Sequence, residues 1–480
     1  VFAPRVDFGR LATPLSVADG FIDVPDAHDP AVLVSPDVDW NIIEHGSHQT
    51  AEACVDLDAI GGKLTIELRY GTQCHDAPCP PEPERRQQTV SVWEDWAARL
   101  TLPVLHRQAV LRSAVLLKAL THGPSGAILA AATTSLPEQL GGVRNWDYRY
   151  CWPRDASMAA TSLLRLGSKD EAIALADWFV GLIARMEEPG SLRPLYTVTG
   201  EDLPPEGQIN ELCGYDQSRP VRLSNAAAQQ TQLDVFGPIA DMLATMAERG
   251  VPVCADHWRL VDSMVEAVGT RWREPDHGIW EIRSARCNHV HSRLMCWRTV
   301  SRALAVHSAL HSAANPAWEA LRSSIADDIF ANGWNDRVGA FTVSYGSADV
   351  DATALQIGLH GLIRHDDPRW ASTVDAVQRE LRRGNTVLRY RYDDGLPGRL
   401  AGSVICTCWL VESLVTLGRI DEASGLLEAV LAQAGPTGNL TEQFDGESST
   451  ALGNLPQAYS HLSVINAVLR LENARPPRST

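Results

Sequence analysis

The feature that most constrains the fold is a regular alternation of connection lengths between amphipathic segments after about residue 105. Apolar residues at i, i+3, i+4 and i+7 predict helices over residues 105–120, 155–166, 168–187, 225–248, 255–271, 291–312, 315–331, 350–362, 367–383, 402–418, 420–434 and 457–472. The connections that enter the even-numbered helices span about 18 to 37 residues, whereas those that enter the odd-numbered ones span about one to six. Short connections join antiparallel neighbours, so the pattern predicts a series of helical hairpins.

A ring of such hairpins, with one set of helices inside and the other outside, collects the long loops at one end of the domain. The sequence therefore predicts a mainly α protein built as an (α/α)6 toroid. Compact domains keep long loops chiefly where the loops bind or react. We expect the functional site at the long-loop end.

The first 95 residues have a different sequence pattern. Short β-branched and apolar runs, such as residues 31–34 and 63–70, are interrupted by Pro and Gly and predict antiparallel strands. The predicted organisation is an all-β N-terminal domain over residues 1–95, a linker over 96–104, a helical domain over 105–474 and a tail over 475–480.

Charge and composition exclude several classes of partner. The 480 residues carry 42 Lys and Arg against 59 Asp and Glu, a net charge of −17, which disfavours nucleic acid and anionic membrane surfaces. The sequence has no apolar run of the roughly 18 residues that a membrane helix needs. It also opens without a secretory leader, and its ten cysteines are scattered, which predicts a cytoplasmic protein with free thiols. A disulfide is kept as an alternative only for Cys74 and Cys79, which lie in a Pro-rich loop.

The densest chemistry lies in residues 141–155 (GGVRNWDYRYCWPRD), directly before the second predicted helix. Two Trp, two Tyr, three Arg and two Asp occupy this stretch. Aromatic rings stack on the C–H faces of sugars, and Arg and carboxylate groups bind sugar hydroxyls. We interpret the segment as a sugar-binding loop; a buried ion-pair network at a domain junction is the alternative.

Two further long loops each place a glutamate beside an aromatic residue: Glu281 follows Trp280, and Glu442 precedes Phe444. Hydrolysis of a glycosidic bond requires one carboxyl group that protonates the leaving oxygen and another that activates water. We expect Trp280 to desolvate Glu281, to raise its pKa and so to suit it to the acid role. A single such glutamate is otherwise typical of a surface or helix-capping residue.

Five runs together resemble glycoside hydrolase family 15, which includes glucoamylases, glucodextranases and bacterial trehalases. They are TTSLPEQLGGVRNWDYRYCWPRDA from Thr133, RPVRLSNAAAQQTQLDVFG from Arg219, HGIWEIR from His277, SRLMCW from Ser292 and NLTEQFD from Asn439. The resemblance implies an (α/α)6 barrel preceded by a β-sandwich domain. It also implies inverting hydrolysis of α-glucosides from the non-reducing end, with no cofactor and no metal.

The resemblance assigns roles to particular residues. Glu281 matches the general acid and Glu442 the general base, whose carboxyl groups in an inverting enzyme lie roughly 6.5–9.5 Å apart. The residues implied to bind the non-reducing glucose are Tyr148, Trp152, Arg154, Asp155 and Trp280. A further sugar-binding arginine is either Arg389 or Arg391, and the sequence does not decide between them.

The chain departs from the family pattern at several positions. Arg293 replaces a Lys and Ser301 replaces an Asp, and we expect the change from Lys to Arg to alter the local geometry. The run Leu400–Val404 replaces an E-G-x-F motif, and we expect this loss to reshape the leaving-group side of the pocket. Residues 5–9 resemble a stretch midway through the family's β-sandwich. About half of that domain is therefore expected to be absent, with sheet edges exposed.

Three other classes of protein are kept as alternatives. A zinc-assisted hydrolase would use Cys287, His289 and His291. A non-catalytic carbohydrate-binding or regulatory relative would explain the altered motifs, and a toroidal lyase or epimerase would rely on Tyr, His or Arg as its base. The preferred hypothesis is a hydrolase of a small carbohydrate, α,α-trehalose, with maltooligosaccharides or other α-glucosides second and a homo-oligomeric state left open.

Overall fold

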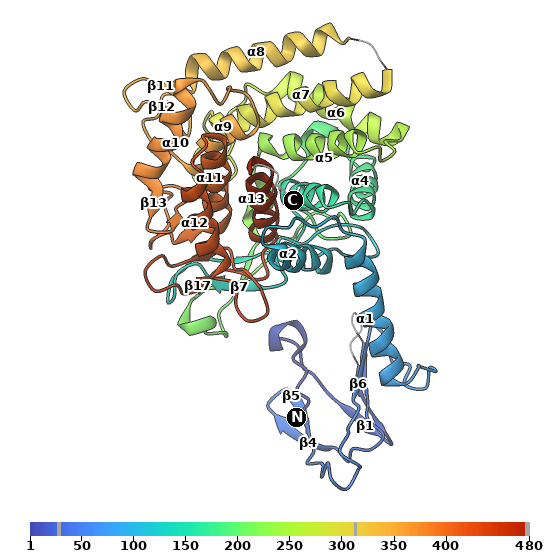
Figure 1. Cartoon of the computed structure of the whole chain (residues 1–480). Coiled ribbons are helices and arrows are strands. Elements are labelled where there is room, and N and C mark those ends of the chain that lie inside the picture. The colour runs from blue at the N-terminus through green and yellow to red at the C-terminus, as the bar shows by residue number, and fades with distance from the viewer. Residues whose placement is uncertain (26–29, 312–313, 476–480) are drawn as a thin grey trace. The chain divides into compact units, whose positions relative to one another are not determined.

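The computed structural model describes residues 1–25, 30–311 and 314–475, and the chain divides into two compact units, Val1–Ala98 and Arg99–Thr480 (Figure 1). The first unit contains a four-stranded antiparallel sheet and a hairpin. The sheet has the order β1 (Ser16–Ala18), β2 (Phe21–Val24), β3 (Ala31–Val34) and β6 (Glu67–Tyr70), and the hairpin joins β4 (Asn41–His45) to β5 (His48–Glu52). Residues from both pack into one small apolar cluster that includes Ile22, Leu33 and Ala51. The predicted antiparallel strands are confirmed.

The same unit ends in a helix, α1 (Glu82–Ala98), where the sequence analysis predicts only strands and a linker. That prediction is wrong because the run Thr89–Val92 alternates β-branched and polar residues as a strand does. In the helix, Val90 and Val92 are exposed and only Trp96 is buried, so the segment lacks the apolar stripe that marks a packed helix.

The second unit is a ring of helical hairpins, α2 (Arg107–Ala119), α3 (Pro153–Arg165), α4 (Asp170–Ile183), α5 (Phe236–Glu248), α6 (Ala255–Arg271), α7 (Val290–His311), α8 (Pro316–Asn332), α9 (Gln356–Leu359), α10 (Pro368–Leu381), α11 (Val404–Thr416), α12 (Ile420–Leu431) and α13 (Ala458–Ala474). The inner helices α3, α5, α7, α9, α11 and α13 each pack on the next, and α13 packs back on α3 to close the ring (Figure 1). The remaining helices lie outside them. The predicted (α/α)6 toroid is confirmed.

Side-chain patterns explain which helices lie inside. Almost every residue of α11 from Val404 to Val415 is buried, as in a helix surrounded by protein on all sides. The outer helix α10 buries one stripe, Trp370, Val374, Val377 and Leu381, whose spacing places these residues on one face. The outer face of α10 is left to polar residues.

The long loops also contain short strands: β7 (Thr134–Pro137), β8 (Asn145–Asp147), β9 (Gly207–Ile209), β10 (Val221–Leu223), β11 (Trp334–Asn335), β12 (Ala340–Phe341), β13 (Arg382–Arg383), β14 (Thr386–Val387), β15 (Gly402–Ser403), β16 (Gln443–Phe444) and β17 (Ala451–Leu452). The last five form one antiparallel sheet. The sequence analysis predicts only helices and connecting loops in this unit and so misses these strands, because strands of two to four residues are too short to show alternation.

Two of the predicted helices are shorter than expected. Residues 226–229 and 233–235 form the 3-10 turns η4 (Ala226–Gln229) and η5 (Leu233–Val235), so α5 begins only at Phe236. Likewise η6 (Ala352–Leu355) precedes the single turn of α9. Both irregular stretches lie at the loop end of the inner helices, and Ala227 of η4 lines the cavity described below.

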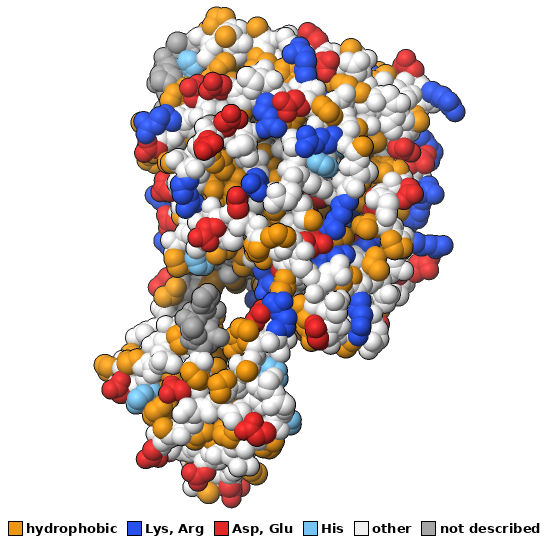
Figure 2. All heavy atoms as spheres, turned by 180° about the vertical axis from the view of Figure 1, so that it is seen from behind, with side chains coloured by type: hydrophobic (Ala, Val, Ile, Leu, Met, Phe, Trp, Pro, Cys, Tyr) orange, Lys and Arg blue, Asp and Glu red, His pale blue; other side chains and the backbone are white. Residues whose placement is uncertain are grey.

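The surface of the second unit mixes both signs of charge. Figure 2 shows acidic and basic side chains interspersed over this face of the unit, as in an ordinary solvated surface. Among the described residues, the helices are all too short or too polar to cross a bilayer.

Candidate active site

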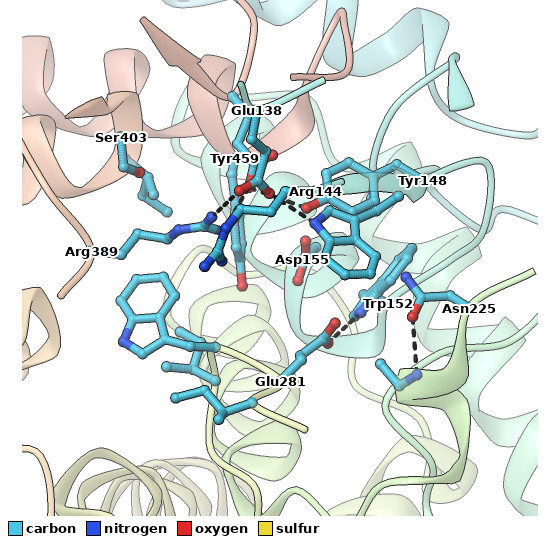
Figure 3. Close-up of a pocket in the computed structure, with 18 of the residues that line it drawn as sticks. Glu138, Arg144, Tyr148, Trp152, Asp155, Asn225, Glu281, Arg389, Ser403 and Tyr459 are labelled. Atoms are coloured by element: carbon cyan, nitrogen blue, oxygen red, sulfur yellow. Dashed lines mark hydrogen bonds and ion pairs between the residues drawn. The ribbon is translucent and has the colours of Figure 1, made fainter. Parts of the chain in front are cut away.

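The long loops surround a cavity at the end of the toroid where the inner helices begin (Figure 3). The lining residues come from five of the long connections and from the first turns of α3 and α13. They include Glu138, Arg144, Trp146, Tyr148, Trp152, Arg154, Asp155, Asn225, Ile279, Trp280, Glu281, Arg389, Tyr390, Asp394, Ser403, Glu442, Gln457 and Tyr459. Eight of the nine residues predicted from the sequence are therefore brought together.

Glu281 lies on one side of the cavity, held by hydrogen-bond donors. Trp152 Nε1 donates to Glu281 Oε1 at 2.7 Å, Gln232 Nε2 donates to the same oxygen at 3.3 Å, and Arg154 Nη2 lies 3.6 Å from it. Glu281 itself adopts a left-handed backbone conformation with φ of 57°, which is uncommon for a residue with a side chain. Strained backbone of this kind is typical of functional sites.

The turn that delivers Glu281 depends on Gly278. Gly278 has φ of +68°, and a Cβ at this position would lie 3.0 Å from the ring of His289. Only glycine fits both the conformation and the space. The motif HGIWE is therefore a tight turn packed on the start of α7.

Trp280 is anchored by a hydrogen bond of its indole and by two aromatic neighbours. Its Nε1 donates at 2.8 Å to Asp351 Oδ2, at the start of η6, and its ring packs against Tyr390 and Trp409. Trp280 also lines the cavity. The described partners of the Glu281 carboxylate are polar groups from the α3 and η5 regions.

Glu442 lies on another wall and is 7% exposed. Its Oε1 accepts hydrogen bonds from Tyr148 Oη and from Arg389 Nη1, both at 3.2 Å, whereas Oε2 is buried without a hydrogen-bond partner among the described residues. Burial and the nearby charge of Glu138 raise the pKa of Glu442 well above that of an ordinary carboxyl group, more than Arg389 lowers it. A buried carboxylate oxygen without a donor is suited to accept a proton from a bound water.

The backbone around Glu442 is fixed by short strands. Val404 N donates to Glu442 O at 3.1 Å where β15 leads into α11, and β16 follows directly. Gly453 packs against the side chain: with φ of +82°, a Cβ there would lie 3.0 Å from Glu442 Cβ and 3.2 Å from Oε2. The sequence analysis did not single out Gly453, which becomes visible only once β16 and β17 pair.

One segment connects the two glutamates. Tyr148 donates to Glu442, Trp152 donates to Glu281, and the two rings meet edge to face with centroids 5.6 Å apart. A displacement of this segment would therefore move the partners of both carboxylates together.

Arg154 and Asp155 form the buried floor of the cavity. Arg154 is 4% exposed, donates to Asp234 Oδ2 at 2.9 Å and to Gln232 Oε1 at 3.1 Å, and also contacts Asp155 and the hydroxyl of Tyr459. Burial raises the pKa of Asp155 to about 6, although Arg154 opposes this effect. The sequence analysis missed Gln232, Asp234 and Tyr459, because their role depends on contacts between segments far apart in the chain.

A second group of missed residues lines the opposite wall, where Figure 3 shows Glu138, Arg144 and Arg389 gathered. Arg144 forms a bidentate pair with Asp394 at 2.6 and 2.8 Å, and Tyr390 Oη donates to the same carboxylate at 2.7 Å. Burial opposes the ionisation of Asp394, but these hydrogen bonds bring its pKa down to about 2. Arg144 and Glu138 lie within the first family-like run, which was the available signal for them.

Of the two candidate arginines in the 389–393 segment, only Arg389 lines the cavity. Arg391 is largely exposed, with Nη1 3.8 Å from Glu380 Oε2, and lies in an adjoining outer groove. Among the departures from the family pattern, Ser403 reaches the cavity, whereas Arg293 is buried against the carbonyl oxygen of Glu274 and Asn288 Oδ1.

The cysteine and histidine motif after the Glu281 loop forms a chain of contacts. Cys287 Sγ lies 3.3 Å from His289 Nε2, and His289 Nδ1 lies 3.0 Å from Asp276 Oδ1. His291 lines a neighbouring cavity that shares Arg154 and Ile279 with the first. Over the described ranges, no group of three or more His, Cys, Asp or Glu side chains could hold a metal ion. All ten cysteines, Cys74 and Cys79 included, lie in the described part of the chain and are free thiols.

Comparison with known structures defines the class of fold. A bacterial glucoamylase complexed with acarbose superposes with a TM-score of 0.70 at 13% identity, over 95% of this chain and 73% of that one. A wild-type glycosidase superposes with a TM-score of 0.60 at 22% identity, over 79% and 98% of the two chains. These likenesses place the second unit among the (α/α)6 toroids.

Sequence comparison gives the family. Residues 104–469 match the family described as glycosyl hydrolases family 15, and residues 1–93 match one described as trehalase-like, N-terminal. The chain belongs to glycosyl hydrolase family 15.

Curated relatives extend the comparison. A trehalase of Mycobacterium tuberculosis is 39% identical over 82% of this chain and 58% of its own length. A trehalase of Thermoplasma acidophilum is 34% identical over 81% of this chain and 67% of its own. The chain thus spans about three fifths to two thirds of the length of these relatives.

Proposed function

We propose that this chain is an inverting, exo-acting α-glucoside hydrolase that releases glucose and whose substrate is α,α-trehalose. The observation that carries the proposal is the pair of glutamates in one cavity. Glu281 is held by donors on one wall, and Glu442 presents a buried, unpartnered oxygen on another. Curated relatives named trehalase, which match over most of this chain, support the choice of substrate.

In the proposed mechanism Glu281 protonates the glycosidic oxygen while Glu442 accepts a proton from water through Oε2. Water attacks the anomeric carbon from the face opposite the leaving group, the glycosidic bond breaks, and the configuration inverts. The raised pKa of Glu442 makes its ionised form a stronger base than an ordinary carboxylate. The cycle ends when Glu442 returns its proton to solvent and Glu281 regains one.

The floor of the cavity is suited to the non-reducing glucose. Arg154 and Asp155 offer a donor and an acceptor to sugar hydroxyls, while Trp280 and Trp152 supply apolar faces. The contacts of Arg154 with Asp234, Gln232 and Tyr459 hold the guanidinium before the sugar arrives, which reduces the entropy lost on binding.

The first test is glucose release from trehalose, maltose, maltotetraose and dextran by the purified chain, with Glu281→Gln and Glu442→Gln as controls. We expect trehalose to be hydrolysed preferentially and each variant to lose roughly 10²- to 10⁴-fold in kcat. Preference for the oligosaccharides would move the assignment to a glucoamylase-type enzyme. A folded chain that releases no glucose would contradict the enzyme proposal and leave a binding or regulatory relative.

A second test separates the two roles. Fluoride leaves with little need of a proton, so α-glucosyl fluoride bypasses the general acid but still needs the base. We expect Glu281→Gln to hydrolyse this substrate well and Glu442→Gln to hydrolyse it poorly. The opposite result would make Glu442 the acid and Glu281 the base. This exchange needs a test because the raised pKa of Glu442 favours its protonated form, which an acid requires.

The cytoplasmic location predicted from the sequence remains part of this proposal, whereas the sequence leaves the oligomeric state open. Size-exclusion chromatography with light scattering would measure the number of subunits directly.

A further inference from the structure

The carboxylate of Glu138 lines the cavity but has no role in the mechanism above. Glu138 follows β7, is 1% exposed, and contacts two side chains of the site. Its Oε2 accepts a hydrogen bond from Arg389 Nη2 at 2.6 Å, and its Oε1 accepts one from Trp146 Nε1 at 3.0 Å. Both oxygens therefore have a partner in the described structure.

Arg389 is shared between two carboxylates. It gives Nη2 to Glu138 at 2.6 Å and only Nη1 to Glu442, at 3.2 Å. An arginine that faces a single carboxylate prefers a bidentate pair in which two parallel N–H groups contact both oxygens. With Nη2 occupied by Glu138, Arg389 contacts Glu442 Oε1 alone and Oε2 receives no donor from it.

Two further observations fix this arrangement in place. Trp146, the other partner of Glu138, has the guanidinium groups of Arg222 and Arg283 at 4.7 and 4.8 Å from its ring. The backbone oxygen of Arg389 accepts a hydrogen bond from Ala352 N at 2.9 Å, at the start of η6. The indole of Trp146 is thus packed against two guanidinium groups, and the backbone of Arg389 is anchored at the start of η6.

The charged and titratable groups that act on Glu442 come from four elements. They are Glu138 after β7, Tyr148 after β8, Asp155 on α3 and Arg389 after β14. Of these, Glu138 acts on Glu442 both directly, as a like charge, and indirectly, by competing for Arg389.

We propose that Glu138 is a positioning residue for the general base, which binds one arm of Arg389 and so leaves Oε2 of Glu442 available to the attacking water. This inference rests on the proposed function, because it concerns how Glu442 acts as a base. Without Glu138, Arg389 is free to turn both arms to Glu442, where it would occupy Oε2 and stabilise the ionised carboxylate.

The first experiment needs no catalysis. The full chain, labelled with ¹³C at the glutamate side-chain carboxyl, is titrated by NMR, and the Glu442 resonance is assigned by its loss in Glu442→Gln. We expect the titration midpoint of Glu442 to move to lower pH in Glu138→Gln and to return toward the wild-type value in Glu138→Asp. An unchanged midpoint in a folded Glu138→Gln protein would overturn the inference.

The second experiment measures the pH dependence of glucose release from trehalose by the same proteins. Glu138→Gln is expected to lower kcat roughly tenfold with little change in KM, and to move the acid limb of kcat/KM to lower pH. A rise in KM with an unmoved limb would indicate a substrate-binding role instead and would count against the inference.

Glu206→Gln is the matched control. Glu206 pairs with Arg283 at 2.6 Å and with Arg222 at 3.4 Å, and it is not among the residues that line the cavity. Its removal takes away a nearby carboxylate without touching Arg389, so the Glu442 midpoint should stay where it is. A shift as large as that of Glu138→Gln would show that any neighbouring charge has this effect and would overturn the specific role. If the wild-type chain releases no glucose, the proposed function fails while the NMR titration still tests Glu138.

Discussion

At the scale of single residues, the two glutamates differ in what surrounds them rather than in what they are. Glu281 accepts hydrogen bonds from Trp152 and Gln232, whereas Glu442 is buried with one oxygen unpartnered. The sequence suffices to pick out both glutamates, because each follows a recognisable motif in a long loop. It does not predict the hydrogen-bond partners of either carboxylate, since these partners come from segments distant in sequence.

The raised pKa of Glu442 leads to a prediction about pH. The base must be ionised to act, and burial together with Glu138 favours its protonated form. As pH falls through this raised pKa, Glu442 gains a proton and kcat/KM should fall, so activity is lost at a higher pH than an ordinary glutamate pKa of about 4.3 would allow. The pH profile of kcat/KM for trehalose measures this limb, and a limb near the ordinary value would contradict the prediction.

Gly453 offers a second prediction. In Gly453→Ala the left-handed backbone costs about 1–2 kcal/mol, and the new Cβ presses on the Glu442 side chain. We expect a lower free energy of unfolding together with a roughly 10- to 100-fold lower kcat/KM. Gly418→Ala is the control, because Gly418 has φ of +74° with nothing within 4 Å of its Cβ position. It should lose stability and keep its activity; equal losses of activity in both variants would show that strain alone is responsible.

At the scale of elements, the packed helices of the toroid were predictable, whereas the exposed helix α1 and the loops were not. The i, i+4, i+7 stripe of α10 and the continuous apolar run of α11 mark an outer and an inner helix directly in the sequence. Strands such as β15 and β16 have two residues each, and their pairing places Glu442 beside the start of α11. No local pattern encodes that pairing. Glu138 and Gly453 were missed because their roles depend on contacts between distant segments. Tyr148, Trp152 and Arg389 were found because they lie in recognisable motifs.

The start of η6 connects an element to the site. Asp351 caps η6 by accepting a hydrogen bond from Thr353 N at 3.1 Å, and its other oxygen holds the indole of Trp280 at 2.8 Å. We expect Asp351→Ala to lower the free energy of unfolding by about 2 kcal/mol and to raise KM for trehalose. Chemical denaturation and steady-state kinetics measure the two effects.

Asp367→Ala separates the loss of the cap from the loss of the anchor. Asp367 caps α10 by accepting a hydrogen bond from Arg369 N at 2.9 Å, and it is not among the residues that line the cavity. The Asp367→Ala substitution should lower the free energy of unfolding by about 1 kcal/mol and leave KM for trehalose unchanged. A normal KM in Asp351→Ala would argue that Trp280 keeps its place without Asp351.

At the scale of the whole molecule, the two units differ greatly in the core they can bury. The first unit relies on a cluster of Leu15, Ile22, Val24, Ala31, Leu33 and Ala51, whereas the toroid buries most of its inner helices. Small cores contribute little stability. The two units therefore need not unfold together.

We expect calorimetry of the full chain to show two transitions, the first from residues 1–98. Because the lining residues of the cavity lie between residues 130 and 459, glucose release should survive heating to a temperature between the two transitions. Activity that disappears with the first transition would show that the first unit supports the site.

The direction of the inner helices has a consequence for the field inside the cavity. In the described toroid, α3, α11 and α13 each begin beside cavity residues, at Trp152, Ser403 and Gln457, and the other inner helices run the same way round the ring. The positive ends of these helix dipoles therefore point toward the cavity. Parallel dipoles generate a positive potential in a cavity crowded with carboxylates such as Glu138, Asp155, Glu281 and Glu442. In a chain with a net charge of −17, this potential offsets part of the cost of burying several carboxyl groups around an uncharged sugar.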